Sequence, residues 1–201
     1  MKLQIRTDDR IFIVGRPQSG KTTLMVTLFR NSKRAVMIDT LHLHTSKDIM
    51  IAHDIETLEE TLQKDTLAIY QPETYNHAEA LNEVVQLCWS KSNIMLFIDE
   101  AQFYMTLYEI QPSLKYLLTA GKNHGLGCCM ITQSPVGVVH PLMRRLLDKL
   151  ICFKLSEEEI EFLEEKFHKK FKEHINKLGE YEFMVYYAQH DQIRTFSKLK
   201  L

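Results

Sequence analysis

Residues 15–22, GRPQSGKT, have the spacing G-x-x-x-x-G-K-[ST] and lie between an apolar run of strand length and a helix-like stretch. This pattern is typical of a loop that wraps a phosphate chain, with successive backbone N–H groups and a helix N-terminus pointing at negative charge. Lys21 is expected to reach the β- and γ-phosphates of a nucleotide, and the Thr22 hydroxyl to bind Mg²⁺. The predicted nucleotide-binding residues are Gly15, Arg16, Pro17, Gln18, Ser19, Gly20, Lys21, Thr22 and Thr23.

Two adjacent carboxylates, Asp99 and Glu100, follow the apolar run at residues 94–98. Such a pair is hard to keep beside a core without a cation. We expect Asp99 to hold the Mg²⁺ ion and Glu100 to act as a general base that accepts a proton from an attacking water. A base of this kind favours hydrolysis over small-molecule kinase chemistry, in which the enzyme orients an acceptor.

Gln133 ends a further apolar run, CCMIT, at residues 128–132. In an open parallel sheet, ligands gather at the carboxyl ends of the strands. A glutamine there can hydrogen-bond the γ-phosphate or the attacking water, although a polar strand end that faces solvent is the alternative. We predict Glu100, Lys21 and Gln133 to be the catalytic residues.

The four cysteines, Cys88, Cys128, Cys129 and Cys152, contain no C-x-x-C pair. Adjacent strand residues point to opposite faces of a sheet, so Cys128 and Cys129 could not easily share one metal ion. We interpret all four as small buried hydrophobic residues.

Three histidines, His42, His44 and His53, lie close together in the sequence, the first two on one face of a strand-like stretch. No cysteine or carboxylate completes a set with zinc-type spacing. They are interpreted as scattered polar residues.

Apolar runs of strand length alternate with helix-like runs along most of the chain. Strands are expected at residues 11–15, 35–39, 66–71, 93–100, 128–133 and 150–155. Helices are expected from the phosphate loop to residue 29 and at residues 54–63, 76–89, 112–122, 141–149 and 156–171. This alternation predicts an α/β fold with a mostly parallel sheet covered by helices on both faces.

The pattern changes after residue 155. Ser156 and Glu159 have capping-box spacing at the start of the helix at 156–171, and two closing strands or a hairpin are expected at 180–189 and 192–199. We predict a single domain over residues 1–201, with a nucleotide-binding core at 1–155 and a C-terminal helix and hairpin at 156–201.

The composition is that of a soluble globular protein, with 45% hydrophobic and 25% charged residues and a net charge of -1. The chain is no polycation, so any contact with nucleic acid must come from a local patch or from an oligomer. The N-terminus has no apolar signal segment, and the apolar runs are too short to span a membrane. We expect a cytoplasmic protein without direct membrane insertion.

The phosphate loop, the strand that ends in Asp-Glu, and the segments GKNHGLGCCMITQSP and LLDKLICFKL together resemble the HerA/FtsK superfamily of ring-forming nucleic-acid pumps. The resemblance covers residues 11–155, and its most specific part is GLG…TQSP. It implies a RecA-like P-loop ATPase fold with an extra strand between the P-loop strand and the Asp-Glu strand.

With no membrane segment and no preceding barrel-like domain, the chain is most similar to the minimal viral branch of this superfamily. These are the genome-packaging ATPases of internal-membrane icosahedral viruses, including archaeal turreted ones. The resemblance implies ATP hydrolysis with Mg²⁺, a homo-oligomeric ring, and translocation of double-stranded DNA into a preformed capsid. It also implies a place in the host cytoplasm and contacts with capsid-vertex or membrane-associated virion proteins.

In this superfamily, an arginine just upstream of the glutamine strand is often the finger that reaches a neighbouring subunit's ATP. Here that position reads Lys122-Asn123-His124, and lysine is a poorer bidentate partner for phosphate. The candidate trans fingers are therefore Lys122, Arg144 and Arg145, the last two having a solvated helix face as their alternative interpretation.

Two further features leave alternatives open. The basic, aromatic segment KFHKKFK at residues 166–172 could contact DNA phosphates, or its cations could simply favour the C-terminus of a helix.

The chain could also be a nucleotide-switched assembly or regulatory protein without motor activity, or a cellular HerA-like DNA-processing ATPase. A two-lobed helicase is excluded, because about 50 residues after position 155 cannot form a second lobe. The N-K-x-D guanine motif is absent, which favours ATP.

Overall fold

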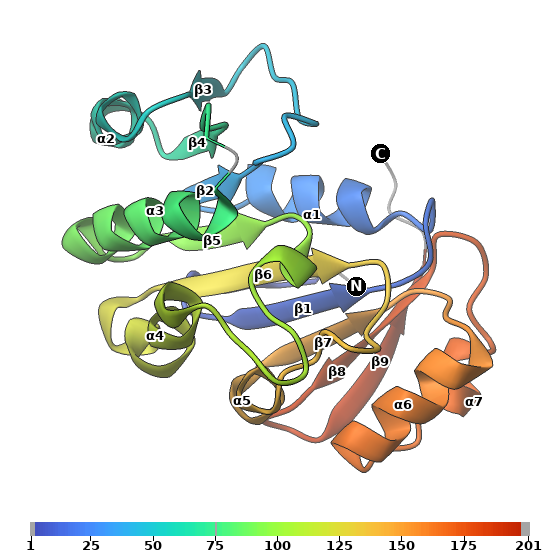
Figure 1. The fold of residues 1–201 in the computed structure, drawn as a ribbon. Coiled ribbons are helices and arrows are strands. Elements are labelled where there is room, and N and C mark those ends of the chain that lie inside the picture. The colour runs from blue at the N-terminus through green and yellow to red at the C-terminus, as the bar shows by residue number, and fades with distance from the viewer. Residues whose placement is uncertain (1–2, 75, 198–201) are drawn as a thin grey trace.

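A computed structural model describes residues 3–74 and 76–197. Within these residues, nine strands form one sheet in the order β3-β4-β2-β5-β6-β1-β7-β8-β9 (Figure 1). The strands are β1 (Arg10–Val14), β2 (Ala35–Ile38), β3 (Met50–Ala52), β4 (Leu67–Tyr70), β5 (Met95–Ile98), β6 (Gly127–Thr132), β7 (Lys149–Cys152), β8 (Phe183–Tyr187) and β9 (Gln192–Phe196).

Two of the helices begin at polar residues that the sequence indicates. Asp54 accepts a hydrogen bond from the Thr57 amide, and Ser156 and Glu159 form a complete capping box. The helices are α1 (Lys21–Arg30), α2 (Ile55–Lys64), α3 (His77–Lys91), α4 (Pro112–Ala120), α5 (Pro141–Leu146), α6 (Glu157–Phe167) and α7 (Lys172–Ile175), with 3-10 turns η1 (Ala101–Phe103) and η2 (Gly121–His124).

Strands β1 to β7 pair in parallel, and β8 and β9 close the sheet as an antiparallel hairpin. The predicted mostly parallel sheet with a C-terminal helix and hairpin is therefore confirmed. Strand β6 lies between β1 and β5, as expected for the extra strand. This order brings the carboxyl ends of β1, β5 and β6 to one edge of the sheet, where the polar residues that follow these strands meet.

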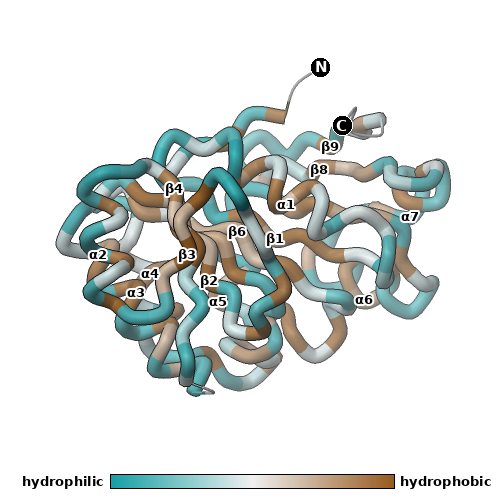
Figure 2. The backbone as a smooth tube through the Cα atoms, turned by 90° about the horizontal axis from the view of Figure 1, so that it is seen from above, coloured by the Kyte–Doolittle hydropathy of each residue, from teal (hydrophilic) through white to brown (hydrophobic). Residues whose placement is uncertain are grey.

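The two faces of the sheet are covered unequally. Alternate residues of β1 point to opposite sides, so Ile11 and Ile13 pack against α1, whereas Phe12 and Val14 face the other helices. Those helices contribute Leu58, Val84, Leu117, Met143, Leu163 and Ile175. Figure 1 shows α1 on one side of the central strands and α4 and α5 on the other, and Figure 2 shows the apolar strands inside a polar periphery.

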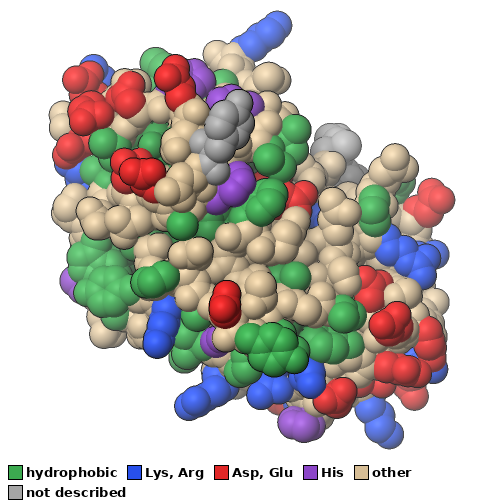
Figure 3. Space-filling model, in the orientation of Figure 1, with side chains coloured by type: hydrophobic (Ala, Val, Ile, Leu, Met, Phe, Trp, Pro, Cys, Tyr) green, Lys and Arg blue, Asp and Glu red, His purple; other side chains and the backbone are tan. Residues whose placement is uncertain are grey.

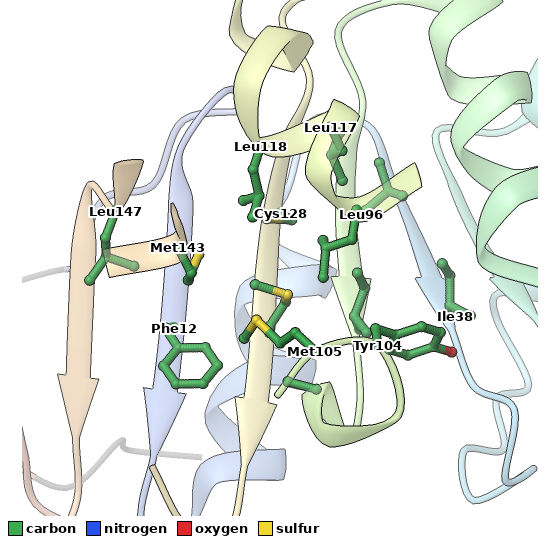
Figure 4. Packing of buried hydrophobic residues seen from close by; sticks show 14 of the residues in the cluster. Phe12, Ile38, Leu96, Tyr104, Met105, Leu117, Leu118, Cys128, Met143 and Leu147 are labelled. Atoms are coloured by element: carbon green, nitrogen blue, oxygen red, sulfur yellow. The ribbon is translucent and has the colours of Figure 1, made fainter. Parts of the chain in front are cut away.

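All four cysteines are buried and unpaired, as predicted. Cys128 packs with Leu117 and Leu118 on the α4 side of the sheet, whereas Cys129 belongs to the cluster around α1 (Figure 4). Burial raises the pKa of the Cys88 and Cys128 thiols to about 12. These thiols are packing groups, and Cys128 and Cys129 lie on opposite faces of β6.

Several predicted boundaries are wrong. The helix expected at 156–171 ends at Phe167, because His168 adopts a left-handed conformation (φ 52°) and Phe171 turns into the core. The helix expected at 141–149 ends at Leu146, since Lys149 already belongs to β7 and forms a buried ion pair with Asp9. Residues 198 and 199 of the last expected strand lie outside the described residues.

The segment between β2 and β4 also differs from the prediction. His42 and His44 lie in a loop and not in a strand, with His42 in the left-handed region (φ 55°), and the short edge strand β3 follows. Within residues 3–74 and 76–197, no helix has the length and apolar character needed to cross a membrane.

Candidate nucleotide-binding and catalytic site

The predicted phosphate loop connects β1 to α1, and its two glycines are required by its shape. At Gly15, a Cβ atom would lie 2.6 Å from the Cβ of Phe153 and 2.8 Å from the Ser19 hydroxyl. Gly20 has φ +103°, a conformation that residues other than glycine rarely adopt, and is the N-cap residue directly before α1. At these two positions the loop has no side chain, so its backbone is open to a ligand, and the N-terminus of α1 follows directly in the chain.

Lys21 is folded back over this loop. Its side chain is buried, and Nζ donates a 2.8 Å hydrogen bond to the Arg16 carbonyl oxygen. Burial lowers the pKa of Lys21, while the negative charges of Glu100 and Asp99 act in the opposite direction. A desolvated ammonium held by one carbonyl is prepared to bind an anion that enters the loop.

Asp99 follows β5, and a histidine from another loop contacts it. Nε2 of His44 lies 3.1 Å from Oδ2 of Asp99, and the two side chains are 11% and 10% exposed. The hydrogen bond to Asp99 raises the pKa of His44 above its ordinary value, although burial acts in the opposite direction. The carboxylate predicted to hold Mg²⁺ is thus already oriented by a donor that the sequence interpretation dismissed.

Glu100 has a strained backbone, with φ 62° and ψ 67° at the start of η1. Left-handed conformations are uncommon for residues other than glycine and cluster at functional sites. Its carboxylate accepts a hydrogen bond from the Gln102 amide, whose own oxygen accepts one of 3.1 Å from the Thr132 hydroxyl. Gln102 therefore bridges the carboxyl ends of β5 and β6.

Seven of the predicted site residues line one cavity of about 280 Å³ at this edge of the sheet: Pro17, Gln18, Lys21, Thr22, Asp99, Glu100 and Gln133. The predicted nucleotide-binding residues Gly15, Arg16, Ser19, Gly20 and Thr23 are not among its lining residues. Its lining consists of Pro17, Gln18, Lys21, Thr22, Leu43, His44, Asp99, Glu100, Ile131, Thr132 and Gln133. Arg16 instead donates to the Leu155 carbonyl oxygen at 3.1 Å. A larger cavity of about 850 Å³ lies beside Asp148 and Lys149 and contains no P-loop residue, so volume alone does not locate the chemistry.

The donors in the cavity fit Mg²⁺. Thr22 supplies a hydroxyl and Asp99 a carboxylate, both of them oxygen ligands of the kind that Mg²⁺ prefers. In the described part of the chain, no group of three or more His, Cys, Asp or Glu residues could hold a metal. Mg²⁺ usually takes one or two protein ligands and completes its shell with phosphate oxygens and water. Bound there, Mg²⁺ would neutralise charge on the phosphates.

The three finger candidates lie outside this cavity. Lys122 precedes β6, at the opposite edge of the sheet, and its Nζ is 2.8 Å from Oδ1 of Asp148. Arg144 donates a 2.6 Å hydrogen bond to the Lys166 carbonyl oxygen, and Arg145 is exposed. A side chain that serves a neighbouring subunit must lie away from its own site, so all three remain candidates.

Three polar residues of the site escaped the sequence interpretation: His44, Gln102 and Thr132. Gln102 and Thr132 lie within two residues of Glu100 and Gln133, so proximity to the predicted catalytic residues could have indicated them. His44 is 55 positions from Asp99, and no local pattern signals their contact.

Residues 5–135 match the AAA domain family (AAA_22), which is well over half of the chain, so the chain belongs to this family. No curated protein sequence matches the chain.

Solved structures share the fold over almost the whole chain. One is the genome packaging NTPase B204 from Sulfolobus turreted icosahedral virus 2 in complex with ATP-γS, with TM-score 0.82 and 19% identity over 97% of this chain and 100% of that one. B204, the DNA-packaging ATPase from Sulfolobus turreted icosahedral virus, matches with TM-score 0.77, 19% identity and the same coverages. The N-terminal domain of zonular occludens toxin from Neisseria meningitidis matches with TM-score 0.53 and 16% identity over 96% of each chain.

At these identities the similarity establishes the fold. The chain has the predicted RecA-like P-loop NTPase fold. The expected resemblance to viral genome-packaging ATPases is confirmed for the fold.

Proposed function

We propose that this chain is a Mg²⁺-dependent ATPase that translocates double-stranded DNA as a homo-oligomeric ring and packages a viral genome into a preformed capsid. One observation carries the proposal: Lys21, Thr22, Asp99, Glu100 and Gln133 line one cavity, although they come from three separate segments. Full-length similarity to genome-packaging NTPases supports the choice of motor over other P-loop proteins.

In the proposed reaction, the P-loop backbone and Lys21 bind the β- and γ-phosphates, with Thr22 and Asp99 holding Mg²⁺. Glu100 accepts the proton of the attacking water, and Gln102 fixes its carboxylate. Gln133 hydrogen-bonds the γ-phosphate or the same water. The position of Glu100 supports this assignment, because Glu100 lines the cavity and its backbone has a left-handed conformation of the kind that clusters at functional sites.

Gln133→Ala is expected to lower kcat about 10- to 100-fold while leaving ATP affinity within about 3-fold, since the lost hydrogen bond orients the reacting groups. Phosphate release and equilibrium nucleotide binding measure the two quantities. Gln111→Ala is a matched control, because Gln111 precedes α4 and is not among the residues lining this cavity. Equal turnover for Gln133→Ala and the unmutated chain would make Gln133 only a polar strand end.

The motor proposal is tested by ATP turnover with and without double-stranded DNA, together with particle size when both ATP and DNA are present. We expect DNA to stimulate turnover several-fold and the particle to be a multiple of the 23.6 kDa chain. A chain that stays monomeric and shows no stimulation by DNA would instead be a nucleotide-switched assembly or regulatory protein.

The C-terminal basic segment is a weak candidate for DNA contact. Three of its lysines, Lys166, Lys169 and Lys172, form ion pairs with carboxylates. Its aromatic residues pack inward, with the Phe171 ring 5.5 Å from that of Tyr186. Figure 3 shows acidic side chains gathered around α6 on the same part of the surface. These contacts support the interpretation that the segment stabilises the fold. We therefore propose that DNA is contacted elsewhere on the ring.

A further inference from the structure

We propose that His44 is a positioning residue for the metal-binding carboxylate, and that Asp39 and Gln71 hold His44 in place beside the nucleotide site. This inference rests on the proposed function, because it assigns a role at the same Mg²⁺–nucleotide site. Nothing in the spacing of the sequence connects His44 to the phosphate loop.

The first step is the contact itself. His44 places Nε2 3.1 Å from Oδ2 of Asp99, and both side chains are almost nine-tenths buried. Since a carboxylate only accepts hydrogen bonds, the His44 ring donates from Nε2. A donor on one oxygen restricts rotation of the carboxylate before any ligand arrives. Hydrogen bonds of this kind to metal-binding carboxylates typically change metal affinity by 10- to 100-fold.

The second step is the support of His44. The Asp39 carboxylate, almost fully buried at the end of β2, accepts hydrogen bonds from the backbone amides of Leu43 at 3.0 Å and His44 at 2.8 Å. The amide of Gln71, at the end of β4, donates to Oδ2 of Asp39 at 2.7 Å and to the His44 carbonyl oxygen at 2.6 Å. The loop is therefore fixed at its backbone as well as at its side chain.

These contacts form a continuous series across the carboxyl ends of three neighbouring strands. It runs from Gln71 after β4, through Asp39 after β2 and His44, to Asp99 after β5. Buried polar groups are costly unless they are satisfied. A surface loop without a role at the site would not need this number of buried partners.

His42 offers a matched control in the same loop. Its Nε2 lies 2.9 Å from the Pro72 carbonyl oxygen, and it is not among the residues lining the cavity. The test variant is His44→Asn, whose amide is too short to reach Asp99, and the control is His42→Asn, since asparagine tolerates the left-handed backbone at position 42. His44→Gln restores a donor at about the distance of Nε2.

The measurement is equilibrium binding of ATP-γS, titrated with Mg²⁺, beside binding in excess EDTA. We expect His44→Asn to raise the Mg²⁺ concentration at half-saturation about 10-fold and to leave binding in EDTA unchanged. His44→Gln should recover most of the loss, and His42→Asn should match the unmutated chain. Gln71→Met should give a smaller shift that adds little to His44→Asn, because Gln71 reaches Asp99 only through Asp39 and His44.

The outcomes separate the two proposals. If the unmutated chain does not bind ATP-γS under either condition, the proposed function fails. If it binds with a clear dependence on Mg²⁺ and His44→Asn leaves that dependence unchanged, the role of His44 is wrong while the proposed function stands. A His44→Asn shift that His44→Gln does not recover, or that His42→Asn reproduces, would assign the effect to loop packing and overturn the positioning role.

Discussion

Glu100→Gln is expected to reduce ATP turnover by about 10²- to 10⁴-fold, the contribution typical of a general base. Glutamine has nearly the shape of glutamate but cannot accept the proton of the attacking water. Nucleotide binding should persist, because the P-loop backbone, Lys21 and Asp99 are untouched. Single-turnover phosphate release, beside equilibrium binding of ATP-γS, measures both properties.

Glu109→Gln is the matched control for this change. Glu109 is exposed on the segment that follows η1 and is not among the residues lining the nucleotide cavity, so its turnover should equal that of the unmutated chain. If Glu100→Gln hydrolyses ATP at the unmutated rate, the general base lies elsewhere, and the strained backbone at residue 100 needs another explanation.

Lys21→Met should act on binding more than on chemistry, with ATP affinity falling about 100-fold, or about 2.7 kcal/mol. The lysine is the buried cation of the cavity lining, and charge-assisted hydrogen bonds to phosphate are about twice as strong as neutral ones. Methionine keeps the apolar stem and removes the charge. Isothermal calorimetry with ATP-γS checks this expectation.

The thermal stability of the nucleotide-free chain should not fall with the same substitution, Lys21→Met. Burial lowers the pKa of Lys21, which means that the fold disfavours its charged form in the absence of ligand. The thermal midpoint of nucleotide-free Lys21→Met should therefore be unchanged or higher. Lys33→Met, at an exposed position after α1, is the control for loss of one positive charge. Full nucleotide affinity in Lys21→Met would remove Lys21 from the phosphate site.

The central sheet and the phosphate loop were predictable because their signals are local. Strands β1, β5 and β6 are apolar on both faces, and the parallel sheet follows from that pattern. The carboxyl ends of these strands were expected to converge, and Asp99 and Gln133 do line one cavity. The roles of these residues remain predictions that the variants above would test.

The features that sequence reasoning missed depend on distant partners. Lys149 looks like the end of a helix until Asp9, 140 positions away, supplies its buried ion pair. Strand β3 has three residues and is only partly buried, too short for any periodicity. In the sequence, His44 resembles a scattered polar residue. Its hydrogen-bond partners are Asp39, Gln71 and Asp99, and each of them follows a different strand.

The buried thiols make this chain convenient for site-specific labelling. A maleimide reacts with an accessible thiolate, and burial of Cys88, Cys128, Cys129 and Cys152 removes both the access and the charge. A cysteine introduced at an exposed position, as in Arg145→Cys, would thus be labelled selectively in the native chain without first replacing the others. Fluorescence from that position would report the approach of a second subunit, while slow labelling of the native thiols would measure how often the sheet opens.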